Sequence, residues 1–321
     1  MKKILLKITL LALLINCNAV PGSKDDSKDN MKMFSALIIA TGTSVLNFRL
    51  DSGTQKDVSC TTTNLASTTE TVSGSSNVTL KDARFYVYDV NLLRADGSKQ
   101  PFTLVPDGTY QNSYTSNGTT YSVGLIDFAD KSNDCSAGTM EVLYGSGKNT
   151  ADTNKKLVGY PVYGSFTGVE FKVGLPASLN NLQSDTQTAP LSNTGMYWSW
   201  ASGYKYMKLE FLHKTTNAGV SWHNGSSSCT GSYGSIACTY QNVSTVSITN
   251  TSGFTSSNVI AFNIRDLTTN TNTSASGVSC MNGPQGTMMG ANSNCATMGS
   301  NMGIKSDGTT TTSTQRAFSI Q

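Results

Sequence analysis

Short segments in which apolar and polar residues alternate recur along this 321-residue chain, and they constrain its fold more than any other feature. A period of two is typical of strands with one buried face, and these segments are rich in β-branched and aromatic residues. Turns with Gly, Asn and Asp separate them, and no segment sustains a helical period over many turns. We therefore predict an all-β fold, an antiparallel β-sandwich with long disulfide-stapled loops. The expected strands are 83–90, 102–105, 122–128, 168–174, 204–212, 243–248, 259–264 and 317–320.

The N-terminus has the features of an export signal. Lysines precede a short apolar stretch, residues 8–15, which is too short to span a bilayer. The stretch runs into Leu14-Ile15-Asn16-Cys17, which resembles a bacterial lipoprotein box, so we expect Cys17 to be the lipidated first residue of the mature protein. Ordinary signal-peptidase cleavage near Ala19 is the alternative.

The chain is expected to divide into three parts. These are a lipoprotein signal peptide at 1–17, a solvated tether with a short apolar segment at 18–40, and a single β-sandwich domain at 41–321. The expected location is the periplasm, the outer membrane or the cell surface, with the lipid as the membrane anchor.

Charged residues are scarce, and so are motifs for catalysis. They make up 13% of the chain, against about 25% in an average soluble domain. The net charge of +3 is not gathered into a basic stripe, so we expect no nucleic-acid partner. The sequence lacks the Gly-x-Ser-x-Gly, phosphate-loop and His-Glu-x-x-His motifs and has two histidines, so we expect no enzyme. We expect Asp82, Asp89 and Asp127 to make turn and edge hydrogen bonds.

Six cysteines remain once Cys17 is set aside, and an even number in an exported chain predicts disulfides. Six cysteines allow 15 connectivities. Proximity in sequence favours Cys229–Cys238 and Cys280–Cys295, which leaves Cys60–Cys135. A structural zinc site is the weaker alternative, because no Cys-x-x-Cys spacing occurs.

Several separated motifs occur in the order found in one family of exported bacterial proteins. They are Asp82-Ala83-Arg84-Phe85-Tyr86-Val87, Leu125-Ile126-Asp127-Phe128, Gly174-Leu175-Pro176, Met196-Tyr197-Trp198-Ser199-Trp200, His223-Asn224-Gly225-Ser226-Ser227-Ser228-Cys229, and Cys280-Met281 with Cys295. With this set the chain resembles the MbnP-like family, the four-cysteine half of a "metallo-mystery pair". The resemblance extends from about residue 45 to the C-terminus.

The resemblance implies a copper-binding protein whose partner is a MauG-like di-haem cytochrome c peroxidase. In studied members the partner oxidises a tryptophan to kynurenine, which joins histidines around copper. Trp198 and Trp200 are the leading candidates for this oxidation and Trp222 is third. Their i, i+2 spacing would place the first two rings on one face of an extended strand. Packing in the core is the alternative for either ring.

The histidines differ from the family pattern. The family has Leu-Asn-His where this chain has Leu179-Asn180-Asn181, so a copper site would rest on His223, on His213, and on an oxidised tryptophan. The competing interpretations are that His223 caps a turn and that His213 is a solvated residue at a strand end.

Two further alternatives remain open. Methionines 281, 288, 289, 298 and 302 could hold Cu(I), although we favour a disulfide-stapled surface loop for this segment. In function, the rival to copper binding is a surface adhesion or glycan-binding sandwich with an aromatic platform and no metal.

Overall fold

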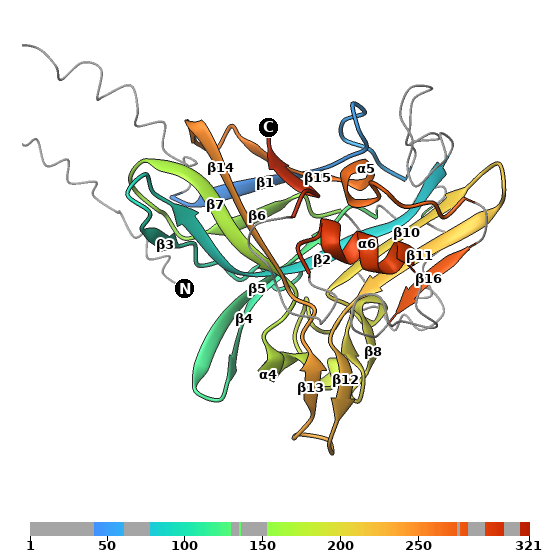
Figure 1. Cartoon of the computed structure of the whole chain (residues 1–321). Coiled ribbons are helices and arrows are strands. Elements are labelled where there is room, and N and C mark those ends of the chain that lie inside the picture. Colours follow the sequence, from blue (N-terminus) through green and yellow to red (C-terminus); the bar gives the residue numbers. More distant parts are fainter. Residues whose placement is uncertain are drawn as a thin grey trace, which may run out of the picture. The chain divides into compact units, whose positions relative to one another are not determined.

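Two β-sheets form the body of the protein in the computed structural model (Figure 1). The described residues all belong to the unit Ser35–Gln321. The expected signal peptide, Cys17 and the tether lie outside them. Within the described part of the chain, no helix is long and apolar enough to cross a membrane. The structure describes residues 42–60, 78–129, 135, 153–274, 277–281, 293–304 and 315–321.

The larger sheet has nine strands, and β2 lies at its centre. Six strands follow the order β14 (Ser244–Phe254), β7 (Phe166–Val173), β2 (Val78–Leu93), β10 (Met207–His213), β11 (Ala218–Asn224) and β16 (Val278–Met281). The remaining strands are β3 (Lys99–Pro101) and β5 (Thr119–Asp127), which pair with β2, and β4 (Gln111–Ser116), which pairs with β5.

The smaller sheet joins segments from the two ends of the domain. Its order is β17 (Phe318–Ile320), β15 (Val259–Asn263), β1 (Ser44–Asp51) and β6 (Lys156–Gly159). Two hairpins stand apart, β8 (Tyr197–Ser199) with β9 (Gly203–Tyr204), and β12 (Ser227–Thr230) with β13 (Ala237–Tyr240). The short helices are α4 (Ala177–Asn180), η2 (Ser184–Thr186), η3 (Thr194–Met196), α5 (Ile264–Leu267) and α6 (Ser293–Asn301).

The predicted all-β sandwich is confirmed. Among the named strands, two pairings are parallel, β1 with β15 and β11 with β16, and the others are antiparallel. Every expected strand overlaps an observed one except 102–105, which is wrong. The regular ladder beside β2 ends with the pair Asn91–Pro101, and Phe102 N–H still donates to the Val90 carbonyl at 2.8 Å, whereas Leu104 forms only an isolated bridge with Gly159.

Phenylalanine side chains pack the two sheets together. From the larger sheet, the Phe85 ring centroid lies 5.7 Å from that of Phe262 and 5.5 Å from that of Phe318. Phe171 lies 5.5 Å from Phe318 and 5.8 Å from Phe48. Such edge-to-face pairs add about 0.5–1.5 kcal/mol each beyond the burial of their surface. This cluster is the centre of the main hydrophobic core.

The three disulfides have the predicted pairing. Cys60–Cys135 and Cys280–Cys295 lie in the buried core, whereas Cys229–Cys238 joins β12 to β13 and is partly exposed.

The expectation that the methionines after Cys280 lie in a surface loop is wrong for two of them. Met298, within α6, and Met302, directly after its end, belong to the buried core, so they are not surface-loop residues. Met288 and Met289 lie outside the described residues.

Strand β2 is buried on both faces. Side chains alternate along a strand, so Phe85 and Val87 face the phenylalanine core while Arg84 and Tyr86 face the other way. On that outer face the segment 175–206 contributes to a second cluster rich in tyrosines. Tyr86 Oη donates a hydrogen bond to the carbonyl of Pro190 (3.1 Å), which ties this segment to the sheet.

The outer face also buries a group of charges. Asp82 accepts a hydrogen bond from Arg84 Nε at 2.8 Å, and Lys208 Nζ lies 2.7 Å from its Oδ2 atom. All three side chains are at least nine-tenths buried. The expectation that Asp82 makes turn or edge contacts is therefore wrong, because β2 is a central strand rather than an edge strand. Asp127 does make a turn contact, accepting from the backbone N–H of Ala129 at 2.9 Å.

We predict that Asp82→Asn lowers the free energy of unfolding by about 3–5 kcal/mol, because it removes the charge that Arg84 and Lys208 share and leaves Lys208 with only the longer, 3.6 Å contact to Glu210. Urea denaturation measures the change. The matched control is Asp57→Asn, since the Asp57 carboxylate meets Lys155 at 2.7 Å on the surface. That variant should lose less than about 1 kcal/mol. Equal losses in the two variants would contradict the assignment.

A second prediction compares two tryptophans. Trp222 on β11 is fully buried in the main core, whereas Trp200 is 38% exposed. Trp222→Ala should lower the free energy of unfolding by about 3–5 kcal/mol through the cavity it leaves. Trp200→Ala should change it by less than about 1 kcal/mol. Denaturant titration followed by far-UV circular dichroism tests the difference, and a larger loss for Trp200→Ala would overturn this view of the core.

Candidate metal-binding site

His223 lies within β11 on the outer face of the larger sheet, paired across the ladder with Lys208. The expectation that it caps a turn is wrong, because the strand continues to Asn224. Its Nε2 atom lies 2.7 Å from Glu210 Oε1. A carboxylate oxygen only accepts, so Nε2 carries the proton and Nδ1 of the neutral ring carries a lone pair. Nδ1 is buried and has no hydrogen-bond partner among the residues that the structure describes.

The surroundings of His223 keep the imidazole neutral. Burial lowers its pKa, and the contact with Glu210 offsets this only in part. The positive charges of Lys205 and Lys208 lower the pKa further. A neutral ring that donates one N–H to a carboxylate and presents its other nitrogen has the arrangement of a metal-ligating histidine.

Glu210 connects the histidine to the buried charges of the outer face. It lies beside Asp82 in the ladder with β2, and Lys208 Nζ is 3.6 Å from its Oε1 atom. Sequence reasoning did not identify Glu210 or Lys208 as neighbours of His223. The i, i+2 spacing of Lys208 and Glu210 on β10 places both on one face of the sheet. The pairing of β10 with β11, which brings His223 beside them, cannot be read from this spacing.

Trp198 lies in the same region as His223. It is partly buried on β8, and its ring packs against Gly225, where a Cβ atom would come within 2.6 Å of the ring. Gly225 follows His223 by two residues. Lys205 Nζ lies 5.7 Å from the ring centroid of Trp198, so the lysine that influences the His223 pKa also contacts this indole. Two of the predicted site residues, Trp198 and His223, therefore lie in the same region, on either side of Gly225 and Lys205.

Trp200 points elsewhere. Strand β8 ends at Ser199 and Trp200 begins a turn, so the expectation that both indoles share one strand face is wrong. Its ring meets Tyr233 edge-on at 5.9 Å. Asn181, at the position of the family histidine, donates from Nδ2 to the carbonyl of Trp200 at 2.8 Å. In Figure 1, β8, α4, β12 and β13 lie together beyond the edge of the larger sheet.

His213 is not near His223. It ends β10, and the ladder with β11 separates the two histidines by five residue pairs, or about 17 Å. The expectation of a solvated residue is also wrong, because alternation on β10 turns His213 toward the core beside Phe211. Its Nε2 atom is 2.8 Å from Thr273 Oγ1, and burial lowers its pKa.

The third tryptophan, Trp222, faces the opposite side of β11 from His223 and belongs to the main core. In the part of the chain that the structure describes, no three His, Cys, Asp or Glu side chains gather as a metal-binding group. The unpartnered Nδ1 of His223, with Trp198 nearby, is therefore the centre of the candidate site.

Comparisons with known proteins agree with this architecture. A solved structure, MbnP from Methylosinus trichosporium, superposes with a TM-score of 0.63 at 21% sequence identity, covering 87% of this chain and 97% of that one. At this identity the likeness establishes the fold. No curated protein matches the sequence significantly. The MbnP family model matches residues 41–282, more than half of the chain, and three disulfides are typical of a periplasmic or extracellular protein. The chain therefore belongs to the MbnP family.

Proposed function

We propose that this protein is an exported, lipid-anchored copper-binding protein that acquires copper or hands it on, and that it is not itself an enzyme. His223 Nδ1 supplies an imidazole ligand. The observation that carries the proposal is that this buried nitrogen has no hydrogen-bond partner among the described residues, while Nε2 of the same ring faces the Glu210 carboxylate. His213 Nδ1 is also without a partner there, but its Nε2 faces the Thr273 hydroxyl rather than a carboxylate. A buried polar atom without a partner is unfavourable, and a metal ion would satisfy it.

The chemistry of the surrounding residues fits copper in part. Neutral imidazole is a strong copper ligand, and Glu210 orients the ring by accepting a hydrogen bond from His223 Nε2, on the side away from Nδ1. Lys205 and Lys208 weaken the binding of a copper ion, because their positive charges repel a cation. Asn181 replaces the second histidine of the family and is engaged with the Trp200 carbonyl. We therefore expect weaker binding than a site with several histidines would give.

Trp198 is the residue that we expect to complete the site. An indole ring is a poor ligand, but its oxidation to kynurenine opens the five-membered ring and leaves an aniline nitrogen and a ketone oxygen. A MauG-like di-haem peroxidase would supply the oxidising equivalents. Trp198 is partly exposed and adjoins Gly225 close to His223, whereas Trp222 is fully buried in the core.

The first test measures copper in protein purified from its native host, and again after reloading with copper and desalting. We predict that His223→Gln raises the dissociation constant for copper at least tenfold, and that Glu210→Gln raises it about 10–100-fold because the imidazole loses its orienting carboxylate. The matched control is His213→Gln, which should bind copper like wild type. Copper content that is low in wild type and unchanged by His223→Gln would refute copper binding at this residue.

The second test is peptide mass spectrometry of protein produced with and without the peroxidase. We predict kynurenine at Trp198 only when the partner is present, with Trp222 unmodified because the core shields it. Trp198→Phe should abolish the modified peptide while Trp200→Phe preserves it. Unmodified Trp198 in the presence of an active partner, or kynurenine at Trp200 alone, would refute the assignment.

A further inference from the structure

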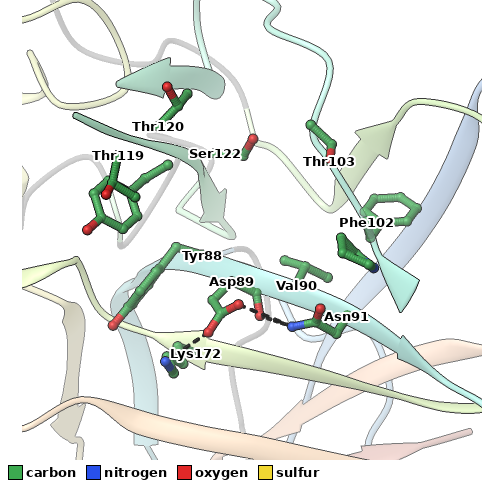
Figure 2. Close-up of a pocket in the computed structure, with 12 residues that line it drawn as sticks. Tyr88, Asp89, Val90, Asn91, Phe102, Thr103, Thr119, Thr120, Ser122 and Lys172 are labelled. Atoms are coloured by element: carbon green, nitrogen blue, oxygen red, sulfur yellow. Dashed lines mark hydrogen bonds and ion pairs between the residues drawn. The ribbon is translucent and has the colours of Figure 1, made fainter. Parts of the chain in front are cut away.

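A cavity with a volume of about 390 Å³ opens beside β2, away from the His223 site (Figure 2). Its size is within the range of small-molecule sites. Tyr88, Asp89 and Asn91 line it from β2, Lys172 lines it from β7, and Thr120 and Ser122 line it from β5. None of these residues belongs to the His223 site.

Asp89 has an unusual backbone in the middle of a long strand. Its φ is +51°, a left-handed conformation that is unfavourable for a residue with a side chain. The pairing of β2 with β7 shifts register between Tyr88 and Asn91, so Asp89 lies in a bulge. Bulges redirect side chains, and strained residues of this kind concentrate at functional sites. The bulge leaves the Asp89 carboxylate about half exposed on the wall of the cavity.

The charges on this wall cancel. Lys172 Nζ lies 2.8 Å from Asp89 Oδ2, and Asn91 Nδ2 donates to the Asp89 carbonyl at 3.0 Å and to Oδ1 at 3.2 Å. Burial acts to raise the Asp89 pKa, but these contacts outweigh it and hold the pKa below its ordinary value. The pair is therefore ionised at neutral pH, with no net charge to attract an ionic ligand.

The rest of the lining offers hydroxyl groups and aromatic surface. In Figure 2, Thr119, Thr120 and Ser122 face Asp89 across the cavity. Of the tyrosines in the lining, Tyr88 is buried, with Lys172 Nζ 5.6 Å from its ring centroid, and Tyr121 is partly exposed and supplies the aromatic surface. Together these groups include a carboxylate that only accepts, an ammonium that only donates, and hydroxyls that do both.

We propose that this cavity binds a neutral saccharide. Adjacent hydroxyls of a sugar can donate to the Asp89 carboxylate and accept from the Lys172 ammonium without breaking the pair. The apolar C–H face of the same ring can pack on the partly exposed Tyr121, and the threonine and serine hydroxyls can hydrogen-bond to the sugar hydroxyls that face them. A charged ligand would instead have to compete with the existing ion pair.

The test exposes the full chain to a microarray of immobilised neutral and acidic oligosaccharides, followed by calorimetric titration with the neutral glycan that gives the strongest signal. Wild type should retain neutral glycans in preference to acidic ones. Asp89→Asn keeps the shape of the side chain and tolerates the same φ, but removes the charge, so affinity should fall at least ~10-fold. Asp89→Gly accepts this φ without strain and should show the same loss in a folded protein.

The controls separate this cavity from other surfaces. Asn217→Gly makes the same kind of backbone change at a φ of +55° outside the cavity and should leave binding unchanged. His223→Gln should also leave it unchanged, so this result is independent of copper. Absence of neutral-glycan binding by wild type would overturn the proposal. So would unchanged binding in Asp89→Asn, or binding that is lost on Trp200→Ala, which would place the glycan on the exposed Trp200–Tyr233 pair instead.

Discussion

The packing of phenylalanines between the two sheets determines how the rest of the molecule is arranged. Once Phe85 and Phe171 point toward Phe262 and Phe318, strand alternation fixes the facing of the residues on β7 and of those on β2 between its two register shifts, from Asp82 to Tyr88. Asp82, Arg84 and Tyr86 must then lie on the outer face of the sheet. The buried charges and the tyrosine cluster on that face are therefore a consequence of the core on the opposite face.

Charges buried in this way require partners, and the ladder provides them in sequence from β2 to β11. Asp82 lies between Arg84 and Lys208, Lys208 approaches Glu210, and Glu210 accepts from His223. The series ends at a neutral imidazole with one nitrogen unpartnered. A ring held by an interior strand of the sheet and a partly buried carboxylate loses little conformational freedom when it takes up a ligand.

Local sequence patterns predicted the sheets, the disulfide pairing and the family, because alternation, cysteine spacing and short motifs are properties of neighbouring residues. They did not predict which residues meet across strands. His213 was expected in solvent and is in the core. Whether the side chain of the last residue of β10 points to the core or to solvent depends on the register of β10 against its neighbours. Trp198 and Trp200 were expected on one face, but a turn begins at Trp200. Glu210 could not be linked to His223 because their pairing arises from the hairpin of β10 and β11.

The topology of the smaller sheet has a consequence for the order of events during export. Strand β1 near the start of the domain pairs in parallel with β15, from Asn47 opposite Val259 to Asp51 opposite Asn263. Strand β17, at the C-terminal end, then pairs with β15. A chain that crosses a membrane from its N-terminus delivers β1 long before these partners arrive. The smaller sheet can close only after β15 and β17 have crossed, and until then one side of the phenylalanine core stays uncovered, a state in which exposed apolar surface favours aggregation.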